Sequence, residues 1–270
     1  MTHVSRNLRI LRRMTAIHLA LTLTYRGALL LFMAGSIVVP VVSLLVWRAA
    51  IAGGAQLPVD KSYLTTYFVV LSFVTMATSS WLSLYLSDDI RLGRLSSWII
   101  RPASLLHHFV ANNLAEKVLK TAMLLPIVGV LVFIYADSVT VPTSAGRWSL
   151  FAVSTVLAGA LVFTLDVLVG SLAFWFDDTT ALDRVRILLI NVLSGAVVPL
   201  TLMPEWARGF VLAQPFRFMV SFPVELVTGH LSGRSVATGF ALQLGYVVLA
   251  CAITRAIWNA GLRAYSAVGA

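Results

Sequence analysis

The chain has 270 residues, of which 59% are hydrophobic and only 11% are charged. A soluble domain carries about 25% charged residues and has too little interior to bury so much apolar surface. The composition therefore excludes an ordinary soluble protein and indicates an integral membrane protein. The net charge of +9 fits basic flanks on the inner side of a membrane better than nucleic-acid binding.

Residues 1–26 are predicted to form an amphipathic helix on the membrane surface rather than a cleaved signal. Five arginines are spaced along this stretch, with Leu8, Leu11, Ile17 and Leu21 between them. A basic face and an apolar face on one helix are typical of a segment that lies in the lipid interface.

Six apolar intervals follow and are predicted to cross the membrane. They lie between Arg26 and Arg48, between Lys61 and Asp88, from about Lys120 to Asp137, from Trp148 to Phe176, from about Arg186 to Pro204, and between Arg234 and Arg255. The third is short and contains Pro126, which is expected to kink it. The fold class expected is thus a single all-α membrane domain over residues 1–270 with six transmembrane helices.

Residues 205–234 are too polar and too rich in proline to cross, yet too apolar for a wet loop. We expect two short helices here that re-enter the membrane or dip into its interface. An even number of spans puts both termini on one side, and fourteen of the twenty Lys and Arg residues fall on that side. The positive-inside rule therefore places the termini, and the polar segment 88–118, in the cytoplasm.

The polar segment 88–118 separates the second and third predicted spans. Ile90, Leu95, Trp98 and Ile99 form an apolar stripe on a short predicted helix whose other positions include Arg91. Both a helix resting on lipid headgroups and a knob that docks into a soluble partner fit this pattern.

Catalytic signatures are absent from the sequence: there is no phosphate-binding loop, no zinc motif and no nucleophile elbow. The adjacent pair His107–His108 lacks the i,i+4 spacing of a metal-binding pair, so no metal site is expected. Asp166 lies inside the fourth predicted span, where it serves either as a protein-facing structural acid or as an ion relay in a secondary transporter or channel. A membrane-embedded lipid-modifying enzyme is a further alternative, in which Asp88–Asp89 and Asp177–Asp178 would hold Mg²⁺.

Several short motifs, in their order and spacing, resemble those of type-2 ABC exporter permeases, and most closely the bacterial group of antibiotic exporters. They are Asp89-Ile90-x-x-Gly93-Arg94-Leu95, Ile100-Arg101-Pro102, Ser194-Gly195 with Pro199 and Met203-Pro204, Gln214-Pro215-Phe216, and Phe222-Pro223-Val224-Glu225-Leu226-x-x-Gly229. With the six spans and the amphipathic start, the resemblance covers nearly the whole chain.

The resemblance implies a non-enzymatic permease subunit in the bacterial plasma membrane. Two permeases, identical or related, would pair in the lipid and bind two ATPase subunits, which hold the ATP and Mg²⁺; this chain itself would hold no cofactor. The residues implied to couple to the ATPase are Asp88, Asp89, Ile90, Arg91, Gly93, Arg94, Leu95, Trp98, Arg101 and Pro102. The residues expected along the pathway or its gates are Phe32, Phe68, Phe73, Asp166, Leu193, Pro199, Pro215, Pro223 and Glu225.

Overall fold

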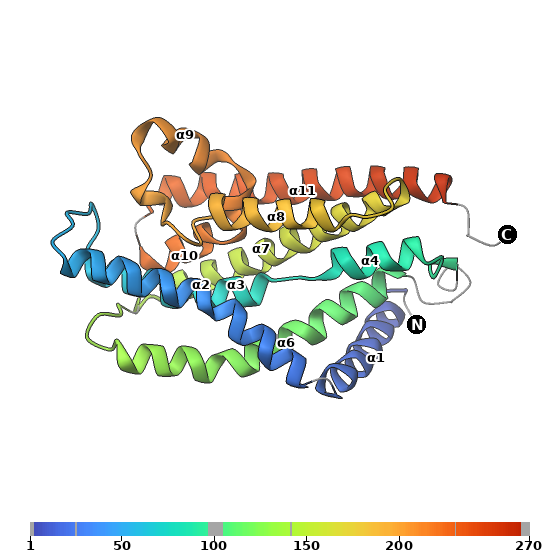
Figure 1. The fold of residues 1–270 in the computed structure, drawn as a ribbon, viewed down its shortest axis with the longest axis horizontal. Coiled ribbons are helices and arrows are strands. Elements are labelled where there is room, and N and C mark those ends of the chain that lie inside the picture. Colours follow the sequence, from blue (N-terminus) through green and yellow to red (C-terminus); the bar gives the residue numbers. More distant parts are fainter. Residues whose placement is uncertain (1–2, 25, 97–104, 141, 230, 266–270) are drawn as a thin grey trace.

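In a computed structural model of the full chain, all regular secondary structure of the described residues is helical (Figure 1). These are residues 3–24, 26–96, 105–140, 142–229 and 231–265, and the side chains of residues 3–5, 26 and 28–36 lie outside the description.

The first half of the chain begins with two helices, α1 (His3–Thr24) and α2 (Arg26–Ala52). Next come α3 (Lys61–Thr78) and the short α4 (Leu82–Arg91). The Asp60 carboxylate accepts a 2.7 Å hydrogen bond from the Tyr63 amide and so caps the start of α3. A non-helical link, Ser79–Trp81, separates α3 from α4 and is visible as the extended thread between them in Figure 1.

The second half is built around α7 (Ala145–Ser171), which packs against α3, α4, α10 and α11. It follows the long helix α6 (Leu105–Ile134) and continues into the 3-10 turn η1 (Leu172–Phe174). The remaining elements are α8 (Thr180–Leu193), η2 (Leu200–Leu202), α9 (Glu205–Ala213), η3 (Pro215–Met219), α10 (Ser221–Thr228) and α11 (Gly233–Ala264).

Four of the described helical segments are long and apolar enough to cross a membrane. They are Lys61–Arg91, Leu105–Ile134, Ala145–Phe174 and Gly233–Ala264, and they correspond to the second, third, fourth and sixth predicted spans. The helix α2, at the place of the first predicted span, has 27 residues, and its described part contributes the shorter apolar stretch Ile37–Ala52. The chain is thus an all-helical, multi-pass membrane protein.

The second predicted span corresponds to the candidate span Lys61–Arg91, which is interrupted at Ser79–Trp81. Two other predicted boundaries were wrong. The third helix begins at Leu105 rather than near Lys120, so half of the predicted polar segment belongs to a 30-residue helix. The predicted fifth span is not a continuous helix, since α8 has 14 residues and ends at Leu193, where Ser194 and the positive-φ Gly195 (φ +87) follow.

The main apolar core joins α3, α7 and α10, with aromatic side chains such as Tyr67, Phe218 and Phe222 at its centre. A second, smaller cluster forms around Leu86 and Phe109, where α4 meets α6 and α7. At Gly170 a Cβ atom would lie 2.8 Å from the Ser83 carbonyl oxygen, so glycine allows α4 to approach α7 this closely.

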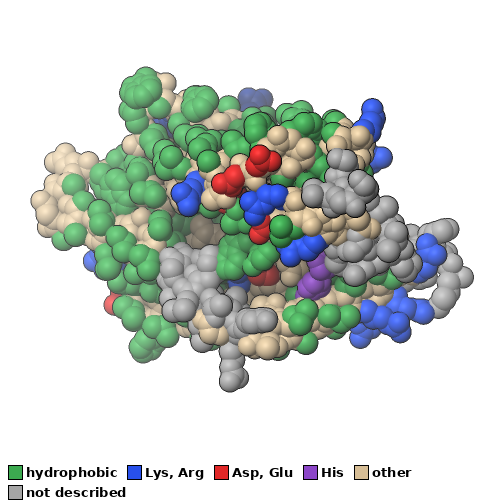
Figure 2. All heavy atoms as spheres, turned by 45° about the vertical axis from the view of Figure 1, so that its right-hand side comes forward, with side chains coloured by type: hydrophobic (Ala, Val, Ile, Leu, Met, Phe, Trp, Pro, Cys, Tyr) green, Lys and Arg blue, Asp and Glu red, His purple; other side chains and the backbone are tan. Residues whose placement is uncertain are grey.

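Charged residues gather toward one end of the molecule. The start of α1, the end of α11 and the end of α4 all lie at this end (Figure 1). On the face drawn in Figure 2, hydrophobic side chains dominate the left, whereas most Lys, Arg, Asp, Glu and His side chains lie over the middle and right. Such a division matches an apolar body that sits in lipid and a polar end that meets water.

Candidate functional site

The break between α3 and α4 is the structural centre of the candidate site. A helix that stops leaves unpaired carbonyl groups at its C-terminus, and one that starts leaves unpaired amides at its N-terminus. Lys117 of α6 donates from Nζ to the carbonyl oxygens of Ala77 (2.9 Å) and Ser79 (3.0 Å). On the other side of the break, the Leu82 amide donates to Oδ2 of Asp166 in α7 (2.9 Å). A cation thus stabilises the end of α3 and an anion the start of α4, as the two helix dipoles require.

A second lysine completes the α6 side of the break. The ammonium group of Lys120, whose side chain is 0% exposed, donates to the Ser79 hydroxyl (2.9 Å) and is paired with Glu116. It also lies 4.2 Å from the ring centroid of Trp81, a cation–π contact. Because a buried ammonium is costly unless it is paired, these contacts explain how a lysine occurs at this depth in an apolar helix.

Asp166 is linked to α8 by a chain of buried charges. Its Oδ1 atom lies 2.8 Å from Nη1 of Arg186, and Arg186 also binds Asp183 through Nε (3.0 Å) and Nη2 (2.8 Å). Asp183 in turn accepts a 2.6 Å hydrogen bond from the Ser83 hydroxyl of α4. The network therefore ties α4, α7 and α8 together through buried charges.

Among the described coupling residues, Asp88 to Arg91 end α4, and Gly93 to Leu95 belong to a tight turn directly after it. Arg91 pairs with Asp88 at 3.1 Å, and Arg94 pairs with Asp89 at 2.9 Å. Gly93 has φ +71, a left-handed conformation that side-chain-bearing residues rarely adopt, and its amide donates to the Ile90 carbonyl at 3.1 Å. The turn is thus held by its own backbone and by two ion pairs.

The apolar residues of this segment do not all lie on its surface. Ile90 and Leu95 are buried in the cluster around Leu86 and Phe109, whereas the side chain of Leu92 is 58% exposed. Within the described residues, the surface open to a partner is therefore formed by Leu92 with Arg91 and Arg94. The predicted residues Trp98, Arg101 and Pro102, and Ile99 of the apolar stripe, lie outside the described residues.

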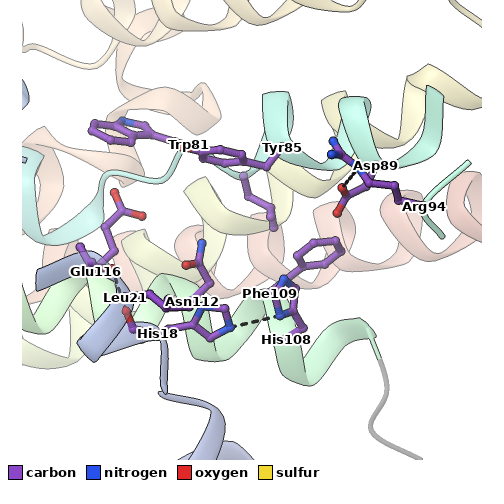
Figure 3. A pocket seen from close by; sticks show the side chains of 12 residues that line it. His18, Leu21, Trp81, Tyr85, Asp89, Arg94, His108, Phe109, Asn112 and Glu116 are labelled. Atoms are coloured by element: carbon purple, nitrogen blue, oxygen red, sulfur yellow. Dashed lines mark hydrogen bonds and ion pairs between the residues drawn. The ribbon is translucent and has the colours of Figure 1, made fainter. Parts of the chain in front are cut away.

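A cavity of about 650 Å³ lies beside the turn, between α1, α4 and α6 (Figure 3). Its polar lining includes Glu116 and Asn112, while Trp81 and Tyr85 lie along the opposite wall. At its floor, Nε2 of His18 and Nδ1 of His108 share a 3.1 Å hydrogen bond that joins α1 to α6.

This histidine pair predicts that the attachment of α1 depends on pH. Burial lowers the pKa of His18 below its ordinary value of 6.5, so the folded chain favours the neutral ring. The unfolded chain takes up this proton near pH 6.5, so the stability contribution is present above that pH and is lost as pH falls below it. We expect the protection of the α1 amides, corrected for the intrinsic exchange rate at each pH, to fall between about pH 6.5 and 5. A His18→Phe variant should lose this pH dependence, and an unchanged profile in that variant would show that other groups cause it.

The segment before α11 contains the short helices expected from its prolines. Gln214 caps η3 by accepting from the Phe216 amide (2.6 Å), and its side-chain amide donates to the Leu193 carbonyl (2.7 Å). Arg217 and Glu225 form a buried ion pair at 2.5 Å between η3 and α10. These contacts fold the segment back onto the end of α8.

The residues expected along the pathway are mostly part of the interior of this chain. Phe68 is buried in the main core and Phe73 packs against it, while Pro199 and Pro223 are buried at helix starts. Pro215 is half-buried in the first turn of η3. The side chain of Phe32 lies outside the described residues.

Sequence reasoning missed the charge network as a unit. Lys120 follows Glu116 by four residues and Lys117 by three, so on a helix it lies beside both. This spacing indicates a group of interacting charges only if the residues lie in one helix, and the sequence prediction had started that helix near Lys120 rather than at Leu105. The pairing of Arg186 with Asp166 carried no signal, because it joins two helices by tertiary packing.

A comparison with protein families gives one match. The model of the ABC-2 family transporter protein matches residues 60–269, which span every helix from α3 to α11. No curated protein matches the chain. The match covers the helix break, the charged turn and the broken segment before α11, and the chain therefore belongs to the ABC-2 family of transporters, as a membrane component.

Proposed function

We propose that the chain is the permease subunit of an ATP-driven exporter, which forms the substrate path and is driven by a separate ATPase. The observation that carries this proposal is the turn 88–96, a compact charged surface at the end of the short helix α4. Family membership implies an ATPase partner, and an exposed leucine flanked by two arginines suits a contact with a soluble protein.

In this proposal, ATP and Mg²⁺ are held by the partner, and two ATPase copies close on nucleotide binding. Their movement displaces the turn and, with it, α4. Because α4 packs on α7 and is tied to α8 through Ser83 and Asp183, the displacement reaches the helices that surround the substrate path. The permease thus contributes two packing states of different energy rather than chemistry.

The proposed assembly contains a second permease, identical or related, in a bacterial plasma membrane with both termini in the cytoplasm. Support comes from α8, whose outer face carries the exposed side chains of Val185, Leu188 and Val192. A helix of 14 residues with such a face needs either lipid or another protein against it. The antibiotic-exporter group remains the proposed relationship within the family.

The first experiment is affinity purification of the tagged chain in mild detergent, with mass spectrometry of the soluble proteins that accompany it. We expect an ATPase, and we expect Leu92→Asp to reduce its recovery at least about tenfold, because the variant would bury an unpaired charge in the contact. The matched control is Trp206→Asp, which changes an 88% exposed apolar side chain on α9. Equal ATPase recovery with both variants, or solute transport by the purified chain without a nucleotide-hydrolysing partner, would contradict the proposal.

A further inference from the structure

The sequence at the α3–α4 break contains no residue that forces a helix to stop. Thr78-Ser79-Ser80-Trp81 has neither proline nor glycine, the usual causes of a sharp interruption. On length and apolar character, Lys61–Arg91 would form one transmembrane segment of 31 residues. The interruption must therefore be stabilised from outside the segment.

The groups that stabilise it come from two different helices. Lys117 and Lys120, both in α6, donate hydrogen bonds to the α3 side of the break, at Ala77 and Ser79, and Lys120 also lies over the Trp81 ring. Asp166, in α7, contacts the α4 side, at the Leu82 amide. Non-helical backbone at membrane depth is tolerated where protein groups satisfy its polar atoms, and these contacts do so here.

We propose that Ser79–Trp81 is a joint between α3 and α4, and that Lys117 and Asp166 are positioning residues that hold it open against formation of one continuous helix. Weakening either contact shifts the segment toward the continuous helix, because the freed carbonyl or amide group is then best satisfied by an ordinary i→i−4 bond.

The joint lets α4 move separately from α3, and this is the movement that the proposed coupling needs. If α3 and α4 were one rod, a push at the turn 88–96 would tilt the whole segment, including its outer half in the main core. With the joint, α4 moves against α7 and α8 while α3 keeps its packing against α2 and α10. This consequence rests on the proposed function, whereas the joint itself is a property of the single chain and can be measured on it alone.

The test measures a distance across the joint in the full chain in detergent. Spin labels are placed at Lys61 and Leu84 after Cys251→Ser, and double electron–electron resonance gives the distance distribution. A residue rises about 1.5 Å in a helix and about 3.3 Å in extended chain, so closing the three-residue break shortens the distance by about 3–5 Å. We expect a shorter population in Lys117→Met and in Asp166→Asn, and the parent distance in Lys117→Arg.

The controls distinguish a variant that has lost the joint from a variant that has failed to fold. Arg184→Met removes an exposed cation of α8 and should keep the parent distance. Ser79→Ala/Ser80→Ala raises helix propensity and removes one hydrogen bond of Lys120 but leaves it paired with Glu116, so it should also shorten the distance even if the charge variants fail to fold. Parent distances in every folded variant would overturn the joint. In that case ATPase recovery with Leu92→Asp would still test the proposed function separately.

Discussion

Replacing Arg186 by methionine is expected to lower the stability of the chain by about 3–5 kcal/mol. Arg186 is the shared partner of Asp166 and Asp183, and all three side chains are buried. Its removal leaves the buried carboxylates of Asp166 and Asp183 close together, with no guanidinium group to neutralise them. Thermal unfolding in detergent, followed by circular dichroism, measures the effect.

Arg184 provides the matched control for this prediction. It lies two residues earlier on α8 and is exposed, so Arg184→Met should change stability by less than about 0.5 kcal/mol. The double variant Arg186→Met/Asp183→Asn should recover part of the loss, because one of the two unpaired charges is gone. An Arg186→Met chain that unfolds at the same temperature as Arg184→Met would show that the network contributes nothing.

Replacing Glu225 by glutamine is expected to be the second most damaging change, at about 3 kcal/mol. The substitution keeps the shape of the side chain but leaves the buried guanidinium of Arg217 without its carboxylate. Arg217 retains its 3.1 Å hydrogen bond to the Leu212 carbonyl, which cannot neutralise its charge. We therefore expect η3 and α10 to separate first, seen as faster amide hydrogen exchange in residues 215–228 and a lower unfolding temperature.

The control is Glu205→Gln, at the exposed first turn of α9. An exposed carboxylate in the first turn of a helix interacts favourably with the helix dipole, which contributes about 0.3–1 kcal/mol. If Glu225→Gln and Glu205→Gln lower the unfolding temperature equally, the Arg217–Glu225 pair is not what holds this segment together.

The apolar composition was sufficient to predict a helical membrane protein, because only lipid can solvate so much apolar side chain and only helices or closed barrels satisfy the backbone there. The short helices after Pro204 were also readable, since proline fixes φ and removes a backbone donor. The left-handed turn at Gly93 lies where a short helix was expected. The motifs in these two segments carried the family resemblance, and the family match over residues 60–269 confirms it at the level of the ABC-2 transporters. The six-span count, the coupling role of the turn and the pathway residues stay predictions.

The tertiary structure alone decided where helices are interrupted and which buried charges meet. Nothing in Thr78-Ser79-Ser80-Trp81 specifies a break, because these residues tolerate either a helix or a link; the break exists because Lys117 and Asp166 reach it from α6 and α7. Likewise, the sequence pattern placed Ile90 and Leu95 on an apolar stripe that could dock into a partner, whereas in the structure both side chains are buried within the chain. Local sequence determines which conformations a segment can adopt, whereas the polar partners supplied by distant helices determine which one is stable in a medium without water.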